Sequence, residues 1–309
     1  MAYSLILYSK GKSMTNIVNF RCKHRHSALS HPQCYAAYLR GDKHVKGVKH
    51  HRSARILLLD IETLPGEGYF FDPRIDYLSA DKVIKDVSIS CWAAKWLFEP
   101  EIMGEVVSAK DAYLRKDDTV LDGIWKLMNE ADIVITHNGL KFDIPVLYGR
   151  FVTYQMIPPA KFQNVDTCQT AKSVFKFSHN GLDQLGQRFG IGKKIDMSFL
   201  DWKNCLTNDK NATVALEQML TYCKNDIAPL LEDVYLAMLP YIPNHPNLGL
   251  WSIDGSDHCK NCESTDLYWN GKAYATPSGL WKSWRCNTCG AVGRGTGKEN
   301  KLPVKLSLT

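Results

Sequence analysis

The chain has 309 residues, of which 45% are apolar and 23% are charged, and its formal net charge is +6. This is the composition of an ordinary globular protein with room for one sizeable domain and small additional modules. No apolar run approaches the roughly 18 residues of a membrane helix. The apolar stretch 2–8 is short and lacks the basic lead of a secretory signal, so we expect a cytoplasmic protein with no membrane partner.

Charge is distributed unevenly along the chain. Residues 1–55 carry eleven Lys and Arg against one acid, and residues 247–309 carry eight against five. Because these ends contribute +10 and +3 to the total of +6, the segment 56–246 has a net charge of −7. Basic ends suit a polyanionic partner, and the acids between them are available for cations. The alternative is that basic termini only aid solubility.

Composition divides the chain into three parts. Residues 1–53 form a basic module rich in histidine, residues 54–243 show alternating strand and helix patterns, and residues 244–309 are rich in Gly and Trp. Three prolines between positions 240 and 246 cannot continue a helix, so they mark the second boundary.

The middle part has the periodicity of an α/β fold. Its apolar runs predict buried strands at 55–61, 83–92 and 132–136, and its helical patterns predict helices at 119–130, 144–151, 167–175, 182–189 and 212–239. When strands alternate with helices in this way, functional residues gather at the strand ends.

Two acidic residues end the first predicted strand. Asp60 and Glu62 are two positions apart, so their side chains share one face of the strand. Two carboxylates beside a buried strand are costly unless a cation compensates them, and oxygen ligands suit Mg²⁺ or Mn²⁺. The alternative is a strand that simply runs into an acidic turn.

Two further segments place polar groups where they could join this pair. Asp143 follows the strand at 132–136 and a polar turn, although an acid at the start of a helix can also act only as a cap. Tyr222 and Asp226 are four residues apart and share one face of a predicted helix. Taken alone, such a pair is usually an ordinary surface contact.

Taken together, the three segments resemble the DnaQ-like (DEDD) 3′–5′ exonuclease superfamily in its tyrosine-bearing branch. The motifs are Asp60-x-Glu62, then residues 138–143 ending in Phe-Asp, then Tyr222-x3-Asp226. The segment 180–186 is also similar to exonuclease domains of family B polymerases. The resemblance covers about residues 54–240, and the histidine-bearing branch is disfavoured because no His lies four or five residues before the last acid.

The resemblance implies both a fold and a chemistry. The fold is an RNase H-like mixed sheet flanked by helices. Two Mg²⁺ or Mn²⁺ ions would be held by four acids, and Tyr222 would orient the attacking water because its pKa near 10 makes it a poor base. Nucleoside 5′-monophosphates would leave from the 3′ end. The four acids are Asp60, Glu62, Asp143 and Asp226.

Weaker candidates surround these motifs. Contacts to the terminal nucleotide are expected from Thr63, Leu64, Asn138 and Phe142. Two other polar residues have a structural alternative: Asp166 either supports the site or caps a helix, and His137 is predicted as a turn residue.

Four of the ten cysteines form a second motif near the end of the chain. Cys259-x2-Cys262 and Cys286-x2-Cys289 resemble a zinc ribbon, because each pair can supply two sulfurs to one zinc ion. Tyr and Trp residues between the pairs predict strands, with turns at 270–271 and 278–279. Basic residues beside these aromatics suit single-stranded nucleic acid, although Trp residues that pack a small core are an equal alternative. The basic residues are Lys282, Arg285 and Arg294.

The remaining cysteines differ in context. Cys91, Cys168, Cys205 and Cys223 lie in apolar or helical surroundings and are predicted as buried structural thiols. We predict a second zinc site in the basic N-terminal module, where a metal-free arm that contacts phosphates is the alternative. Its predicted ligands are Cys22, His26, His31 and Cys34, with His24 as a substitute for His26.

The leading hypothesis is a free-standing 3′–5′ exodeoxyribonuclease that acts on single-stranded 3′ ends of DNA in repair or recombination, or a proofreading subunit for a replication polymerase in trans. A 3′–5′ exoribonuclease with the same site is the first alternative. A non-catalytic, zinc-dependent protein that binds nucleic acid is the second, and the complete set of acids argues against it.

Overall fold

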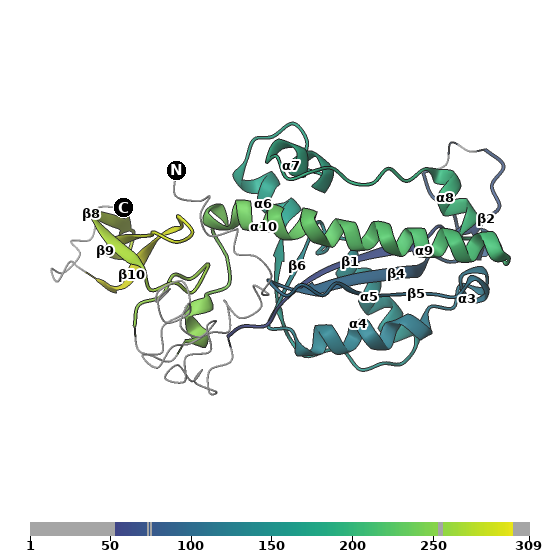
Figure 1. The fold of residues 1–309 in the computed structure, drawn as a ribbon, viewed down its shortest axis with the longest axis horizontal. Helices are drawn as coiled ribbons and strands as arrows, with labels where there is room; N and C mark the ends of the chain where they lie inside the picture. Colours follow the sequence, from purple (N-terminus) through teal and green to yellow (C-terminus); the bar gives the residue numbers. More distant parts are fainter. Residues whose placement is uncertain (1–52, 73, 75, 253–255, 299–309) are drawn as a thin grey trace. The chain divides into compact units, whose positions relative to one another are not determined.

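A computed structural model of the protein describes residues 53–298, apart from 73, 75 and 253–255 (Figure 1). Most of the predicted N-terminal module and its four candidate zinc ligands lie outside the described residues. Residues Arg55–Ala237 form one compact unit, and the described residues from Met238 onward belong to a second. The two units are described separately below.

The first unit is built on a mixed five-stranded sheet. Its strand order is β5-β4-β1-β6-β7, with β4 antiparallel to its two neighbours, and with β1, β6 and β7 parallel to one another. The predicted α/β class and the mixed sheet are therefore confirmed. The strands are β1 (Ile56–Leu64), β4 (Ser88–Trp96), β5 (Met103–Val106), β6 (Ile133–Thr136) and β7 (Gln163–Asp166).

Helices cover both faces of this sheet. Figure 1 shows α9 along one face, and α4 and α5 along the other. All nine residues of β4 are buried, because the strand lies inside the sheet with both faces covered. The helices are α3 (Ala109–Leu114), α4 (Asp118–Glu130), α5 (Asp143–Thr153), α6 (Thr167–Val174), α7 (Leu182–Arg188), α8 (Phe199–Asn204), α9 (Lys210–Asn225) and α10 (Glu232–Met238).

Two predicted elements are wrong in extent. The strand expected at 83–92 divides at Asp86 and Val87, where the Asp86 side chain accepts a hydrogen bond from Val87 N. The first part, β3 (Val83–Lys85), pairs instead with β2 (Glu67–Gly68) in a small hairpin that includes η1 (Ala80–Lys82).

The helix expected at 212–239 is also interrupted. It breaks within η2 (Asp226–Leu231), where Ala228 has an extended backbone and Pro229 cannot donate a helical hydrogen bond. Asp226 therefore lies at the end of α9 rather than in the middle of a continuous helix.

The second unit contains a three-stranded antiparallel sheet with the order β10-β9-β8. Its small core consists of Cys259, Trp284, Cys286 and Ala291. The turn expected at 270–271 is instead a register shift inside β8, and Gly271 has a φ of 74° there. The elements are η3 (Leu239–Tyr241), η4 (Leu248–Trp251), β8 (Leu267–Thr276), β9 (Gly279–Cys286) and β10 (Val292–Lys298).

Two broader expectations can be compared with this fold. The four cysteines predicted as structural thiols, Cys91, Cys168, Cys205 and Cys223, are all buried, as expected. Among the described residues, no helix has the length and apolar character needed to span a membrane.

Candidate active site

Strand β1 positions the first two acids. Asp60 and Glu62 point to the same side of the sheet, while the Ile61 side chain between them is buried in the core. In register, Asp60 lies opposite Ala93 of β4, and the pairing shifts just after Glu62. The apolar run before these acids therefore fixes both carboxylates at one place on a rigid strand.

Asp143 reaches the same strand from the start of α5. Its buried side chain accepts a hydrogen bond of 3.0 Å from the backbone N–H of Ile61, the residue between the first two acids. The N-cap of α5 is Phe142, so the capping alternative does not describe Asp143. The turn before it is tight: Asn138 has a φ of 68°, and a Cβ at Gly139 would lie 2.4 Å from Thr136.

Asp226 completes the group from the end of α9. Its carboxylate, that of Asp60 and that of Glu62 each offer an oxygen within 4.8 Å of the others, a spacing that could hold a metal ion. Asp226 Oδ1 is buried and has no hydrogen-bond partner among the described residues. A buried acceptor without a partner is costly, so a ligand at this position would stabilise it.

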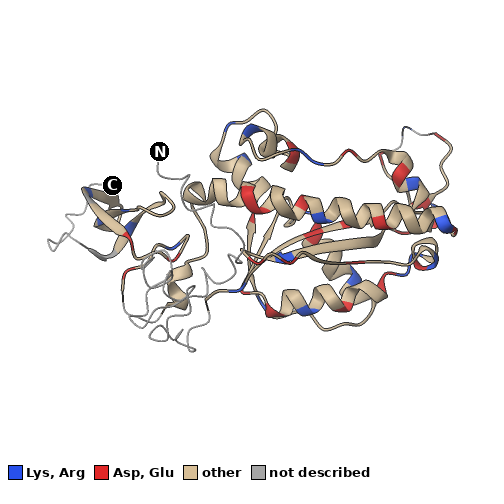
Figure 2. Ribbon diagram, in the orientation of Figure 1, with Lys and Arg blue, Asp and Glu red and all other residues tan. Residues whose placement is uncertain are grey.

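The electrostatics of the group favour a bound cation. Burial, together with repulsion from the neighbouring acids, raises the pKa of Asp60 well above its ordinary value. Burial raises the pKa of Glu62 to about 8 and that of Asp143 to about 7. Figure 2 shows acidic positions on the strands beneath α9 as well as on the helices. Four acids this close cannot all be ionised cheaply without positive charge beside them.

Lys194 supplies such a charge, and sequence reasoning missed it. It lies between α7 and α8, and its Nζ donates to Asp226 Oδ2 and, at 3.2 Å, to the Tyr222 hydroxyl. Burial lowers the pKa of Lys194, but attraction to Asp226 outweighs this and the pKa is raised overall. The backbone N–H of Lys194 donates to Asp183 Oδ1 at 2.8 Å, which anchors the loop to α7. The only signal in the sequence is its position just after the 180–186 segment.

The expected substrate contacts differ in accessibility. Phe142 is 40% exposed, and Thr63 and Asn138 are partly exposed. Leu64 is fully buried in the core, so the expectation that it contacts the terminal nucleotide is wrong for this conformation. Its place at the buried end of β1 explains the difference, because the strand continues to Leu64 and does not end after Glu62.

Asp166 and His137 stabilise the turn that precedes Asp143. Asp166 accepts from Gln169 N as the cap of α6, and also from Asn138 N and Leu140 N. Burial lowers the pKa of His137 to about 4, and its Nδ1 lies 2.8 Å from Thr167 Oγ1. These contacts agree with capping and a turn role, the structural alternatives for these two residues.

The second unit brings four cysteines together in two matching turns. In each turn the N–H of the residue after the second cysteine donates to the carbonyl of the first: Glu263 N to Cys259 O at 2.8 Å, and Gly290 N to Cys286 O at 3.0 Å. Both donor residues have positive φ. Across the turns, the Sγ atoms of Cys259 and Cys289 lie 3.6 Å apart and those of Cys262 and Cys286 lie 3.7 Å apart, so the group could hold a metal ion.

The chain is similar to one protein family and to part of a solved structure. A model of the RNase_H superfamily (RNase_H_2) matches residues 101–235, a segment that includes Asp143, Lys194 and Asp226 but begins after β1. None of the curated proteins matches the chain. A similar solved structure is the family B DNA polymerase from the hyperthermophilic archaeon Pyrobaculum calidifontis, with 18% identity and a TM-score of 0.45. The alignment covers 68% of this chain and 27% of that polymerase.

The first unit therefore has an RNase H-like fold, with a mixed sheet flanked by helices. This fold, with acids clustered over its first strand, suggests a nucleic-acid hydrolase that uses divalent metal ions.

Proposed function

We propose that the protein is a 3′–5′ exodeoxyribonuclease of the DnaQ-like, tyrosine-bearing type, with two Mg²⁺ or Mn²⁺ ions at its acidic site. The observation that carries the proposal is the approach of Asp60, Glu62 and Asp226 within 4.8 Å, with one buried Asp226 oxygen lacking a partner. An all-carboxylate donor set suits hard divalent cations.

Three acids would hold one ion, and Asp143 would assist with the second together with Asp60. The hydrogen bond from Ile61 N keeps Asp143 beside the strand that carries Asp60. Divalent cations held by these residues would lower the pKa of bound water and would stabilise charge on the leaving oxygen. The raised carboxyl pKa values support this assignment, because a cation would favour the ionised forms.

Tyr222 and Lys194 would act beside the ions. Burial raises the pKa of Tyr222, so its hydroxyl stays protonated at neutral pH and can orient a water by hydrogen bonding rather than act as a base. Lys194 donates to that hydroxyl and so fixes its position. The exposed face of Phe142 is available for stacking against the terminal base, with Asn138 and Thr63 near the same turn and strand.

The four cysteines would hold a structural zinc ion in a zinc ribbon. Sulfurs about 2.3 Å from a tetrahedral zinc lie about 3.8 Å from one another. The observed separations of 3.6 and 3.7 Å support this donor set. A site with four protein ligands leaves no position for substrate, so its role would be to stabilise the second unit.

The substrate proposed for the enzyme is single-stranded DNA, with a replication polymerase as a candidate partner in trans.

End-labelled oligonucleotides test the proposal. DNA of one sequence, labelled at the 5′ or the 3′ end, is incubated with Mg²⁺ or Mn²⁺, beside RNA of the same sequence. We expect the 5′-labelled DNA to give a ladder that shortens from the 3′ end, and the 3′-labelled DNA to release a mononucleotide. Asp60→Asn should lower the rate by at least about 10³-fold. The control Asp122→Asn alters an acid whose side chain is 75% exposed, and it should leave the rate unchanged.

Two results would contradict the proposal: internal cuts, or release of mononucleotides from the 5′ end. Faster degradation of RNA than of DNA would transfer the assignment to an exoribonuclease with the same site. Binding of DNA without cleavage under any metal condition would favour a non-catalytic binding protein.

A further inference from the structure

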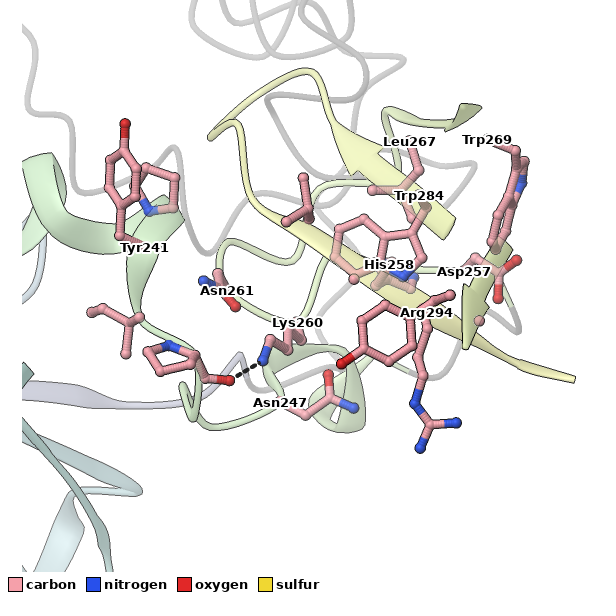
Figure 3. Close-up of a pocket in the computed structure, with 17 residues that line it drawn as sticks. Tyr241, Asn247, Asp257, His258, Lys260, Asn261, Leu267, Trp269, Trp284 and Arg294 are labelled. Atoms are coloured by element: carbon pink, nitrogen blue, oxygen red, sulfur yellow. Dashed lines mark hydrogen bonds between the residues drawn. The ribbon is translucent and has the colours of Figure 1, made fainter. Parts of the chain in front are cut away.

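The second unit contains a cavity of about 580 Å³ beside its sheet (Figure 3). Its walls come from η3, the segment around Lys260, and all three strands. The volume is within the range of cavities that accept small organic ligands or parts of larger ones. The side chains that matter below are Lys260, Trp269, Trp284 and Arg294.

Two indole rings form the floor and one edge of this cavity. Trp269 and Trp284 lie opposite each other in register on β8 and β9. Trp284 is buried in the small core with the cysteines, whereas Trp269 is 45% exposed. Figure 3 shows Trp269 upright at the margin of the cavity, away from the buried ring of Trp284.

Glycines on β10 make room for both rings. A Cβ at Gly293 would lie 2.4 Å from the Trp284 ring, which is closer than side chains tolerate. A Cβ at Gly295 would lie 3.3 Å from the Trp269 ring. The exposed indole therefore rests against the backbone of the edge strand, and this support holds it in place as a flat, rigid apolar surface.

Charge at the cavity is suited to an anion. Two cations, Lys260 and Arg294, line it against one acid, Asp257. Lys260 Nζ donates to Pro243 O at 2.6 Å, and the Arg294 guanidinium lies 4.1 Å from the centre of the Trp281 ring. Lys260 is thus held against a backbone carbonyl of the cavity wall and Arg294 against Trp281, both by contacts within the unit.

We infer that this cavity binds a segment of single-stranded DNA, with a base stacked on Trp269 and phosphates near Lys260 and Arg294. Aromatic faces beside cations are the combination that single strands select, because their bases are exposed and their backbone is anionic. In duplex DNA the base faces are covered, and an apolar peptide would have no use for the cations. The inference rests on the proposed function, for which it supplies a strand-holding site outside the acidic centre.

Binding by the full-length protein tests the inference. Fluorescence anisotropy follows a 5′-fluorescein-labelled (dT)20 without added Mg²⁺ or Mn²⁺, so that no hydrolysis occurs. Because base–aromatic stacking is worth about 1–3 kcal/mol, Trp269→Ala should weaken binding about 5- to 150-fold, and Trp269→Phe should restore most of the loss. Arg294→Gln should lower the slope of log K against log salt by about 0.7.

The neighbouring residue offers a matched control. The Tyr268 side chain is 43% exposed and lies next to Trp269 on β8. It pairs with Arg285 on the face of the sheet opposite Trp269, and it does not line the cavity. Tyr268→Ala should change affinity less than about 2-fold. An abasic oligomer of equal length, which needs no variant, should bind wild type at least as weakly as (dT)20 binds Trp269→Ala.

The outcomes separate this inference from the proposed function. Hydrolysis of the p-nitrophenyl ester of thymidine 5′-monophosphate reports on the acidic centre alone, because the ester is too small to need a second site. Equal binding by wild type, Trp269→Ala and Tyr268→Ala, or equal binding of the abasic oligomer and (dT)20, would overturn the inference even if the ester is cleaved. Weaker binding by Trp269→Ala alone would support it even if the ester is not cleaved.

Discussion

The acidic group and the cysteine group differ in how the chain assembles them. The cysteines come from two short turns with the same backbone hydrogen bonds, and each turn supplies two of the four cysteines. The acids come from β1, the start of α5 and the end of α9, and they meet only when the whole first unit folds.

The two groups also differ in what surrounds them. The four sulfurs lie close together and could hold a metal ion without other ligands. The carboxylates leave an unpaired oxygen and include a neighbouring lysine and tyrosine. A closed group suits a structural ion, whereas an open group with spare polar atoms suits ions that must also contact substrate. Each prediction below tests this contrast, from the largest expected effect to the smallest.

Loss of one cysteine should abolish the second site as a whole. Cys286→Ser should lower the zinc content by one ion per chain and unfold the second unit, because structural zinc contributes about 10–16 kcal/mol to such folds. Hydrolysis of the thymidine ester should persist. The measurements are metal analysis and limited proteolysis. Cys168→Ser, which alters a buried cysteine of the first unit, should leave the zinc content unchanged.

Removal of the lysine charge should impair the acidic site without unfolding the first unit. Lys194→Met removes the donor to Tyr222 and Asp226 and should lower kcat about 10²- to 10³-fold. Lys193→Met is the matched control, because its side chain is 67% exposed and its ammonium pairs with the exposed Asp196. Steady-state kinetics on single-stranded DNA measure both. An equal loss in the two variants would contradict a specific role for Lys194.

Stability without divalent cations should fall as pH rises. The folded-state pKa values of Glu62 and Asp143, about 8 and about 7, lie above their ordinary values, so the folded protein holds protons that the unfolded chain releases. For each group, the free energy of unfolding then falls by about 1.4 kcal/mol for every pH unit of increase between the unfolded-state and folded-state pKa values.

Thermal unfolding between pH 6.5 and pH 8, above the range in which the buried His137 titrates, measures this effect. The Tm should decline across the range, and added Mg²⁺ should raise it more at pH 8 than at pH 6.5. Glu62→Gln removes one titrating group and should flatten the decline. A Tm that rises steadily with pH in the wild type would show that these acids are ionised without a cation.

Loss of the tyrosine hydroxyl should have the smallest effect. Tyr222→Phe keeps the ring and removes only the group that would orient water, so we expect kcat to fall about 10-fold with KM unchanged. Tyr148→Phe, at a partly exposed position on α5, is the control. A loss as large as that of Asp60→Asn would mean that the hydroxyl takes part in proton transfer.

Part of this contrast could be predicted from sequence, because the first two acids and the cysteine pairs have short spacings. Asp60-x-Glu62 and the Cys-x2-Cys pairs are set by strand alternation and by turn geometry, which are local properties. The apolar runs also predicted three strands of the sheet. By contrast, β5 and β7 carry no long apolar run. They form strands because they pair with β4 and β6, and their own residues do not predict this.

The features missed depend on tertiary packing. Lys194 lies in a loop without periodicity, and only the folded chain brings it to Asp226. The break in η2 depends on Ala228 and Pro229, and the helical pattern on either side concealed it. Leu64 was expected to contact substrate from its place beside the motif, but β1 continues two residues past Glu62 and buries it.

The central claim is that the carboxylates form a two-metal centre, and calorimetric titration with Mn²⁺ tests it most directly. In the presence of thymidine 5′-monophosphate, wild-type protein should bind two Mn²⁺ ions per chain, and Asp60→Asn should lose both because we propose that both ions share its carboxylate. Cys286→Ser should retain both. Binding of a single ion, or of two ions that Asp60→Asn leaves unaffected, would contradict the account.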